Sequence, residues 1–110
     1  MRIITAYNQD NRPPMTKNDV LQTLVRFQQN KQDEYHIIRI GIFGSAARDS
    51  LTAQSDVDVV VELTEPDLFV LIGIKQDLEE LLHRPVDIVR YREKMNPSLK
   101  RRIEQEAVYV

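Results

Sequence analysis

The sequence predicts an α/β domain in which helices flank a small mixed β-sheet. Helical and strand-like segments follow one another in the order helix, strand, strand, helix, strand, helix, and the strand-like segments are short, apolar and β-branched. A chain of 110 residues is also large enough to bury roughly two thirds of its unfolded surface around one core. We therefore predict one folded domain over residues 16–110, preceded by a loosely ordered arm over residues 1–15.

The first predicted helix begins after Thr16 and ends near residue 31. Thr16 and Asp19 are three residues apart, which is the spacing of a helix-capping pair. The apolar residues that follow recur with the helical period and would form the buried stripe. These residues are Val20, Leu21, Leu24 and Phe27.

Two paired strands are predicted over residues 36–43 and 56–63. The first is apolar and runs directly into Gly44-Ser45. The residues between the strands begin as a short helical turn and continue as a polar loop. The second strand has valine at positions 57, 59, 60 and 61, and β-branched residues favour strands.

The second half of the chain predicts a helix, a strand and a final helix. Pro66-Asp67 opens the first of these helices, and residues 86–89 form a strand after it. Asn96-Pro97 caps the last helix, which ends near Glu106 and leaves an extended tail. The core stripe of the middle helix would contain Leu71, Ile74, Leu78, Leu81 and Leu82, with Lys75, Asp77, Glu79 and Glu80 in water.

Composition excludes several classes of function. The 17 acidic and 15 basic residues give a net charge of −2, so the protein is not expected to bind long nucleic acid or an anionic membrane. The lack of cysteine excludes disulfides, thiolate nucleophiles and thiolate zinc sites. The longest apolar stretch, residues 68–74, is far shorter than the roughly 20 residues that span a bilayer. We expect a soluble, cytoplasmic protein.

Asp56 and Asp58 are candidate ligands for a metal ion. Side chains alternate across a strand, so both aspartates point to one face and Val57 points to the other. Two like charges at about 4 Å repel by about 4 kcal/mol at an effective dielectric constant near 20. Such a pair needs a shared proton or a cation, and hard carboxylate oxygens suit Mg²⁺.

The turn at Gly44-Ser45 is a candidate phosphate site. Glycine allows the backbone to approach a phosphate closely, and Ser45 adds a hydroxyl at a strand-to-helix turn whose N–H groups favour anions. Arg48, about one helical turn later, offers a guanidinium fork for a phosphate. Both features have an alternative interpretation without a ligand. The turn could be an ordinary loop, and Arg48 could be a surface charge.

Asp87 is the candidate third carboxylate. If its strand lies beside Asp56 and Asp58, it could ligate the metal that activates an acceptor hydroxyl, or accept the proton itself. Two metal ions roughly 3.5–4 Å apart would then clamp the attacking and leaving oxygens of nucleotidyl transfer. The structural alternatives are a solvated strand edge for the aspartate pair and the polar face of an edge strand for Asp87.

These motifs resemble the nucleotidyltransferase superfamily, whose pattern is Gly-Ser, ten residues, Asp-x-Asp and a distant acid. The string from Gly44 to Arg48, together with Ser55 to Asp58, is similar to the minimal nucleotidyltransferases that act as antitoxins beside HEPN-domain toxins. The segments 68–82, 84–87 and 102–110 are also similar to the family. The resemblance therefore covers residues 16–110.

The resemblance implies a polymerase-beta-like core that uses ATP with Mg²⁺, two ions held by Asp56, Asp58 and Asp87. It also implies transfer of AMP to a tyrosine hydroxyl of a HEPN ribonuclease toxin, which silences the toxin in a hetero-oligomer. One departure from the pattern is Asp49, which stands where the family usually has glycine. Its added charge near the triphosphate would weaken nucleotide binding.

Two other functions remain open at the level of the sequence. The protein could neutralise a toxin by occlusion alone, or it could modify a small hydroxylated molecule such as an aminoglycoside. Enzymes of the latter kind usually have an additional helical domain for the acceptor, for which this chain has no room.

The basic groups near the C-terminus could be solvated faces, or could contact an acidic partner or ATP phosphates. They are Arg90, Arg92, Lys94 and Lys100-Arg101-Arg102.

Overall fold

The computed structural model describes residues 15–110, so the arm predicted over residues 1–15 lies, except for Met15, outside the described part of the chain. The predicted alternation of helices and strands is confirmed, and so is the α/β class. The elements in chain order are α2 Lys17–Tyr35, β1 Ile37–Phe43, α3 Gly44–Ala47, β2 Val57–Leu63, α4 Leu68–Leu82, β3 Val86–Arg90, α5 Pro97–Glu106 and β4 Val108–Tyr109. Across residues 15–110, the helices are too short or too polar to cross a membrane.

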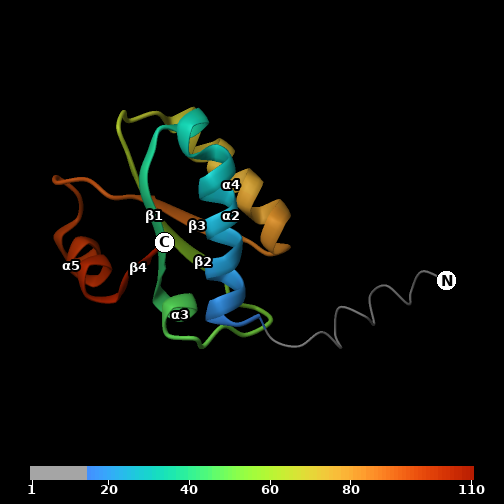
Figure 1. Ribbon diagram of the computed structural model, residues 1–110. Helices are drawn as coiled ribbons and strands as arrows, with labels where there is room; N and C mark the ends of the chain where they lie inside the picture. Colours follow the sequence, from blue (N-terminus) through green and yellow to red (C-terminus); the bar gives the residue numbers. More distant parts are fainter. Residues whose placement is uncertain (1–14) are drawn as a thin grey trace.

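The strands form one mixed sheet in the order β3-β2-β1-β4. Strand β1 is antiparallel to β2 and to β4, whereas β2 and β3 are parallel. Parallel neighbours need a crossover connection, which α4 provides. Helices α2 and α4 cover one face of the sheet, and α5 lies on the other side (Figure 1).

The alternation of side chains along β2 divides the core between the two faces. Val57, Val59 and Val61 are fully buried in the large cluster formed with α2 and α4. Val60 points to the opposite face, where it packs with Phe43 of β1 and other residues of a smaller cluster beneath α5. Because side chains two residues apart share a face, the even-numbered residues of β2 face α5.

Helix α2 is longer than predicted. The capping pair is confirmed, because the Thr16 hydroxyl accepts from the Asp19 backbone and the Asp19 carboxylate accepts from the Thr16 backbone. The predicted end near residue 31 is wrong, since the helix continues to Tyr35 and stops at His36, which has a left-handed φ of 56°. The Tyr35 hydroxyl donates to Asp77 of α4 at 2.7 Å, and this contact holds the last turn.

Two predictions about α4 need correction. Leu81 was expected in the core stripe but is 53% exposed, because Leu78 and Leu82 already occupy the side of the helix that faces the sheet. Lys75, Asp77 and Glu79 are expected in water but are partly buried. Glu79 Oε2 accepts from the Val86 backbone N–H at 3.0 Å and from Lys75 Nζ at 2.7 Å. These contacts fasten the start of β3 to α4.

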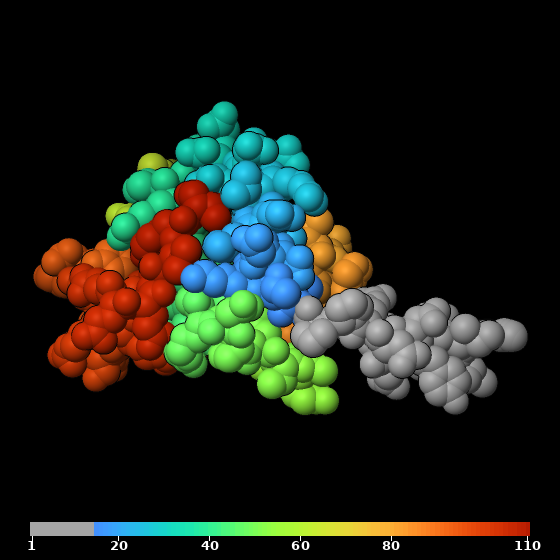
Figure 2. Space-filling model, turned by 60° about the horizontal axis from the view of Figure 1, so that its bottom comes forward, coloured from blue at the N-terminus to red at the C-terminus, as the bar shows by residue number. Residues whose placement is uncertain are grey.

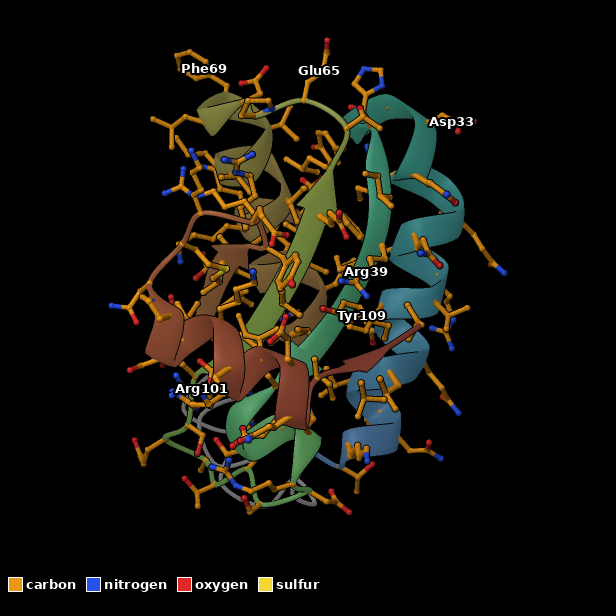
Figure 3. The ribbon with its side chains drawn as sticks, turned by 90° about the vertical axis from the view of Figure 1, so that its left-hand side faces the viewer. Asp33, Arg39, Glu65, Phe69, Arg101 and Tyr109 are labelled. Atoms are coloured by element: carbon orange, nitrogen blue, oxygen red, sulfur yellow. The ribbon has the colours of Figure 1, made fainter. Side chains whose placement is uncertain are left out.

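The C-terminal tail joins the sheet, which the sequence analysis did not predict. Strand β4 pairs with β1 through Gly41 opposite Tyr109 and Ile42 opposite Val108. A Cβ atom on Gly41 would overlap the Val108 carbonyl oxygen and lie 2.9 Å from the Tyr109 Cα. The Arg39 guanidinium lies 4.2 Å from the centroid of the Tyr109 ring, and the two side chains are adjacent in Figure 3.

Replacing Gly41 by alanine is expected to lower the free energy of unfolding by about 1–3 kcal/mol, because the new methyl group must displace the backbone of β4. Urea denaturation measures the change. Gly73→Ala is the matched control, since its Cβ would approach only the Tyr35 side chain, at 3.1 Å, and alanine is favoured in a helix. Equal stability of Gly41→Ala and the unmodified protein would contradict this account of the close approach.

Candidate active site

Gly44 joins the end of β1 to α3 in a conformation that favours glycine. Its φ is 65°, in the left-handed region that costs residues with a Cβ about 1–2 kcal/mol. A Cβ atom at this position would also overlap the Asp58 Oδ2 atom. The backbone of the Gly-Ser turn therefore lies directly against a carboxylate of β2. Ser45 follows in the first turn of α3 and is half-buried.

The sheet brings the predicted acids to one end of the same face. Asp58 is the register partner of Asp87 in the parallel pair of β2 and β3, and of Phe43 in the antiparallel pair of β2 and β1. Asp56 lies immediately before β2. Neighbouring strands are about 4.8 Å apart, so the side chains of Asp58 and Asp87 leave the sheet next to each other.

The electrostatic environment of Asp58 reflects this arrangement. Burial raises the pKa of the Asp58 carboxyl, and the negative charge of Asp87 raises it further. Arg102 lowers the same pKa, and smaller effects come from Asp56, which raises it, and Arg48, which lowers it. A raised carboxyl pKa means that the ionised form is held at a cost, which a bound cation would relieve.

Helix α5 contributes two residues that the sequence analysis did not assign to the site. The Glu106 Oε1 atom accepts from the Gly44 backbone N–H at 3.2 Å and from Arg48 Nη1 at 3.1 Å. Arg102 Nε lies 3.8 Å from the same oxygen, and its Nη2 would be 3.4 Å from a Cβ on Gly44. The red C-terminal segment adjoins the green segment that contains α3 in Figure 2.

The spacing of Arg102 and Glu106 is the one sequence feature that relates these two site residues. They are four residues apart, so they share one face of α5. The basic run at residues 100–102 is visible in the sequence as a possible contact for phosphates. The sequence does not place this helix against Gly44, because that contact depends on the packing of Ile103 with Phe43 and Val60.

Asp49, the departure from the family pattern, takes up a left-handed conformation with φ of 56°. Its carboxylate Oδ1 accepts from the backbone N–H of Lys17 at 2.8 Å. A negative charge at the start of a helix is favourable, because the unpaired N–H groups there carry partial positive charge. The side chain therefore ties the loop after α3 to the start of α2.

The donor set of the site suits Mg²⁺, although the protein does not by itself enclose an ion. Within residues 15–110, no three acidic or histidine side chains come together as a metal centre. Mg²⁺ is usually held by one or two carboxylates together with substrate phosphates and water. The adjacent carboxylates of Asp58 and Asp87, with Asp56 nearby, fit that mode of binding.

The glycine turn packs against the Asp58 carboxylate, and Asp87 is the register partner of Asp58 on the neighbouring strand. The family model described as the nucleotidyltransferase domain matches residues 22–110. The chain belongs to this family.

Similar proteins are known from archaea and bacteria. A Methanocaldococcus jannaschii protein provisionally named protein adenylyltransferase MJ0126 is 31% identical over 86% of this chain and 98% of its own length. Protein adenylyltransferase MntA of Thermococcus cleftensis is 29% identical over 87% of this chain and 97% of its own. In a solved complex of a tri-AMPylated Shewanella oneidensis HEPN toxin with an MNT antitoxin, the matching chain is 17% identical, with a TM-score of 0.63. That match covers 84% of this chain and 70% of the other, and it supports the fold.

Proposed function

We propose that this protein is an antitoxin that transfers AMP from ATP to a tyrosine hydroxyl of a HEPN-domain toxin. The observation that carries the proposal is the contact between the Gly44 turn and Asp58, whose register partner on β3 is Asp87. The adenylyltransferase names of the relatives and the AMPylated toxin bound to the solved antitoxin support AMP as the group and a HEPN protein as the acceptor. We further propose a stable hetero-oligomer with that toxin.

In this proposal, the triphosphate lies against the turn between β1 and α3. The Gly44 backbone and the Ser45 hydroxyl donate to phosphate oxygens, and the Arg48 guanidinium pairs with a phosphate through its fork. Arg48 is 55% exposed and is attached to the short helix next to Gly44, so its side chain has room to reach a nucleotide. This part of the site binds and orients ATP.

The carboxylates of Asp56, Asp58 and Asp87 would hold Mg²⁺, two ions in the full complex. When bound, Mg²⁺ neutralises charge on the triphosphate and on the oxygens that attack and leave. The raised pKa of Asp58 supports this role, because its adjacent negative charges favour a cation. We also propose a cytoplasmic location, which the use of ATP and Mg²⁺ supports.

The reaction is a displacement at the α-phosphorus of ATP. The tyrosine oxygen forms a bond to this phosphorus, the bond to the bridging oxygen of the leaving group breaks, and pyrophosphate departs. The phenolic proton passes to the Asp87 carboxylate. Asp87 is exposed, whereas Asp58 is partly buried beneath α5, so Asp87 is the more accessible acid for an incoming side chain.

Intact-mass spectrometry of the toxin tests the proposal. Incubation of the cognate HEPN toxin with this protein, ATP and Mg²⁺ is expected to add the mass of at least one AMP group to the toxin, at a tyrosine. EDTA is expected to prevent the addition. Neutralisation of the toxin in a stable complex without any adduct would contradict the enzymatic function and favour occlusion.

A further inference from the structure

One oxygen atom of Glu106 contacts the same hydrogen-bond donors that are proposed to bind the phosphate. Glu106 Oε1 receives the Gly44 backbone N–H at 3.2 Å and Arg48 Nη1 at 3.1 Å, with Arg102 Nε at 3.8 Å. A backbone N–H and two guanidinium groups converging on one anionic oxygen form the kind of environment that binds a phosphate oxygen. In the structure, this environment is filled by a carboxylate of the chain itself.

We propose that Glu106 is an internal competitor for the triphosphate, so that nucleotide binding requires its side chain to leave Gly44 and Arg48. The inference rests on the proposed function, since it takes the same donors to be the phosphate ligands. It adds that α5 determines how tightly ATP binds. It also makes Arg102 a further phosphate ligand, because the loss of Glu106 frees its guanidinium beside Gly44 and Asp58.

The position of Glu106 permits this exchange without unfolding the helix. Glu106 is the last residue of α5, and its side chain is 29% exposed, so a change of rotamer can take the carboxylate into water. Ile103, one turn earlier, is fully buried in the cluster with Phe43 and Val60, and it anchors the helix. The ion pairs of Glu106 are partly solvated, and such pairs are weak. A triphosphate carries several negative charges, so it can displace the Glu106 carboxylate from Arg48 and Arg102.

The contact also has a role before nucleotide arrives. Glu106 offsets the positive charges of Arg48 and Arg102 next to the Gly44 N–H group. Displacement of Glu106 moves one negative charge away as the triphosphate brings several. Glu106 therefore keeps the Gly44 N–H group and the two guanidinium groups close together, and it competes with the phosphate for them.

Replacing Glu106 by glutamine tests the inference, because the amide keeps the size of the side chain and removes its charge. We expect the Kd for α,β-methylene-ATP with Mg²⁺, measured by calorimetry without toxin, to fall roughly two- to fivefold, which corresponds to the loss of one partly exposed ion pair. Glu104→Gln is the matched control. It removes the same charge from the same helix, where Glu104 accepts from the Tyr91 hydroxyl, and it should leave the Kd unchanged.

Glu106→Asp supplies a second test that preserves net charge. The side chain is one methylene shorter and cannot maintain the contact with Gly44, so tighter nucleotide binding is expected here as well. An unchanged Kd in Glu106→Gln and Glu106→Asp would overturn the inference. A higher Kd in both would also overturn it and would assign Glu106 the opposite role of aligning Arg48. Failure of the unmodified protein to bind the analogue would instead refute the proposed function.

Discussion

Replacing Asp58 by asparagine is expected to reduce AMP transfer by about 10²–10³-fold, the scale seen when one strong electrostatic contributor is removed from an active site. Asp58 lies against Gly44 and beside Asp87, so its charge contributes both to cation binding and to the position of the triphosphate. The rate of AMP addition to the toxin, followed by intact-mass spectrometry, measures the loss. Asp33→Asn is the matched control, because it removes the same charge from an exposed residue of α2, which covers the face of the sheet opposite to α5 and Asp58 (Figure 1).

The same substitution is not expected to destabilise the fold. Burial and Asp87 raise the pKa of Asp58 above its ordinary value of 3.8. A carboxyl whose pKa is raised on folding contributes stability below its unfolded pKa, and this contribution is lost as the pH rises through the folded pKa. At neutral pH the ionised carboxylate is therefore not stabilising, and a neutral amide does not lower the free energy of unfolding. A parallel loss of transfer and of stability in urea would contradict a catalytic role.

Replacing Gly44 by alanine is expected to have the second largest effect. The positive φ alone costs about 1–2 kcal/mol of stability. The new Cβ would overlap Asp58 Oδ2, so the carboxylate must rotate away from the turn. We therefore expect AMP transfer to fall by about 10²-fold or more, together with a measurable loss of stability in urea.

Asp49→Ala separates a loss of stability in this loop from obstruction of the site. Asp49 has a similar positive φ of 56° but already carries a Cβ, so alanine there acts mainly by removing the hydrogen bond to Lys17. We expect Asp49→Ala to lose about 0.5–1.5 kcal/mol of stability while it retains AMP transfer. Equal losses of transfer in the two variants would show that destabilisation of the loop, rather than the contact with Asp58, causes the effect at Gly44.

The parts of the site that lie on one strand or follow from topology could be predicted from the sequence. The alternation of side chains places Val57 in the core and Asp58 on the opposite face. A helix between two strands favours a parallel crossover, which sets the strand of Asp87 beside that of Asp58. The exact register that places Asp87 opposite Asp58 is seen only in the structure.

Contacts that depend on tertiary packing could not be predicted in this way. The approach of Arg102 and Glu106 to Gly44 follows from how α5 packs on the sheet, and β4 is too short to show a strand pattern. Helix α2 extends beyond residue 31 because nothing in the sequence stops it until His36, and a contact between Tyr35 and Asp77 supports its end. Exposure of Leu81 likewise depends on how α4 is rotated against its neighbours.

Calorimetric titration with α,β-methylene-ATP in the presence and absence of Mg²⁺ is the most direct test of the account, because it isolates the turn and the acids from the partner. We expect the unmodified protein to bind the analogue with Mg²⁺ and to lose most of that binding in EDTA. We expect a variant carrying Asp58→Asn and Asp87→Asn to bind weakly in both conditions. Equal binding with and without the cation, or undiminished Mg²⁺-dependent binding by the double variant, would contradict the assignment of this site.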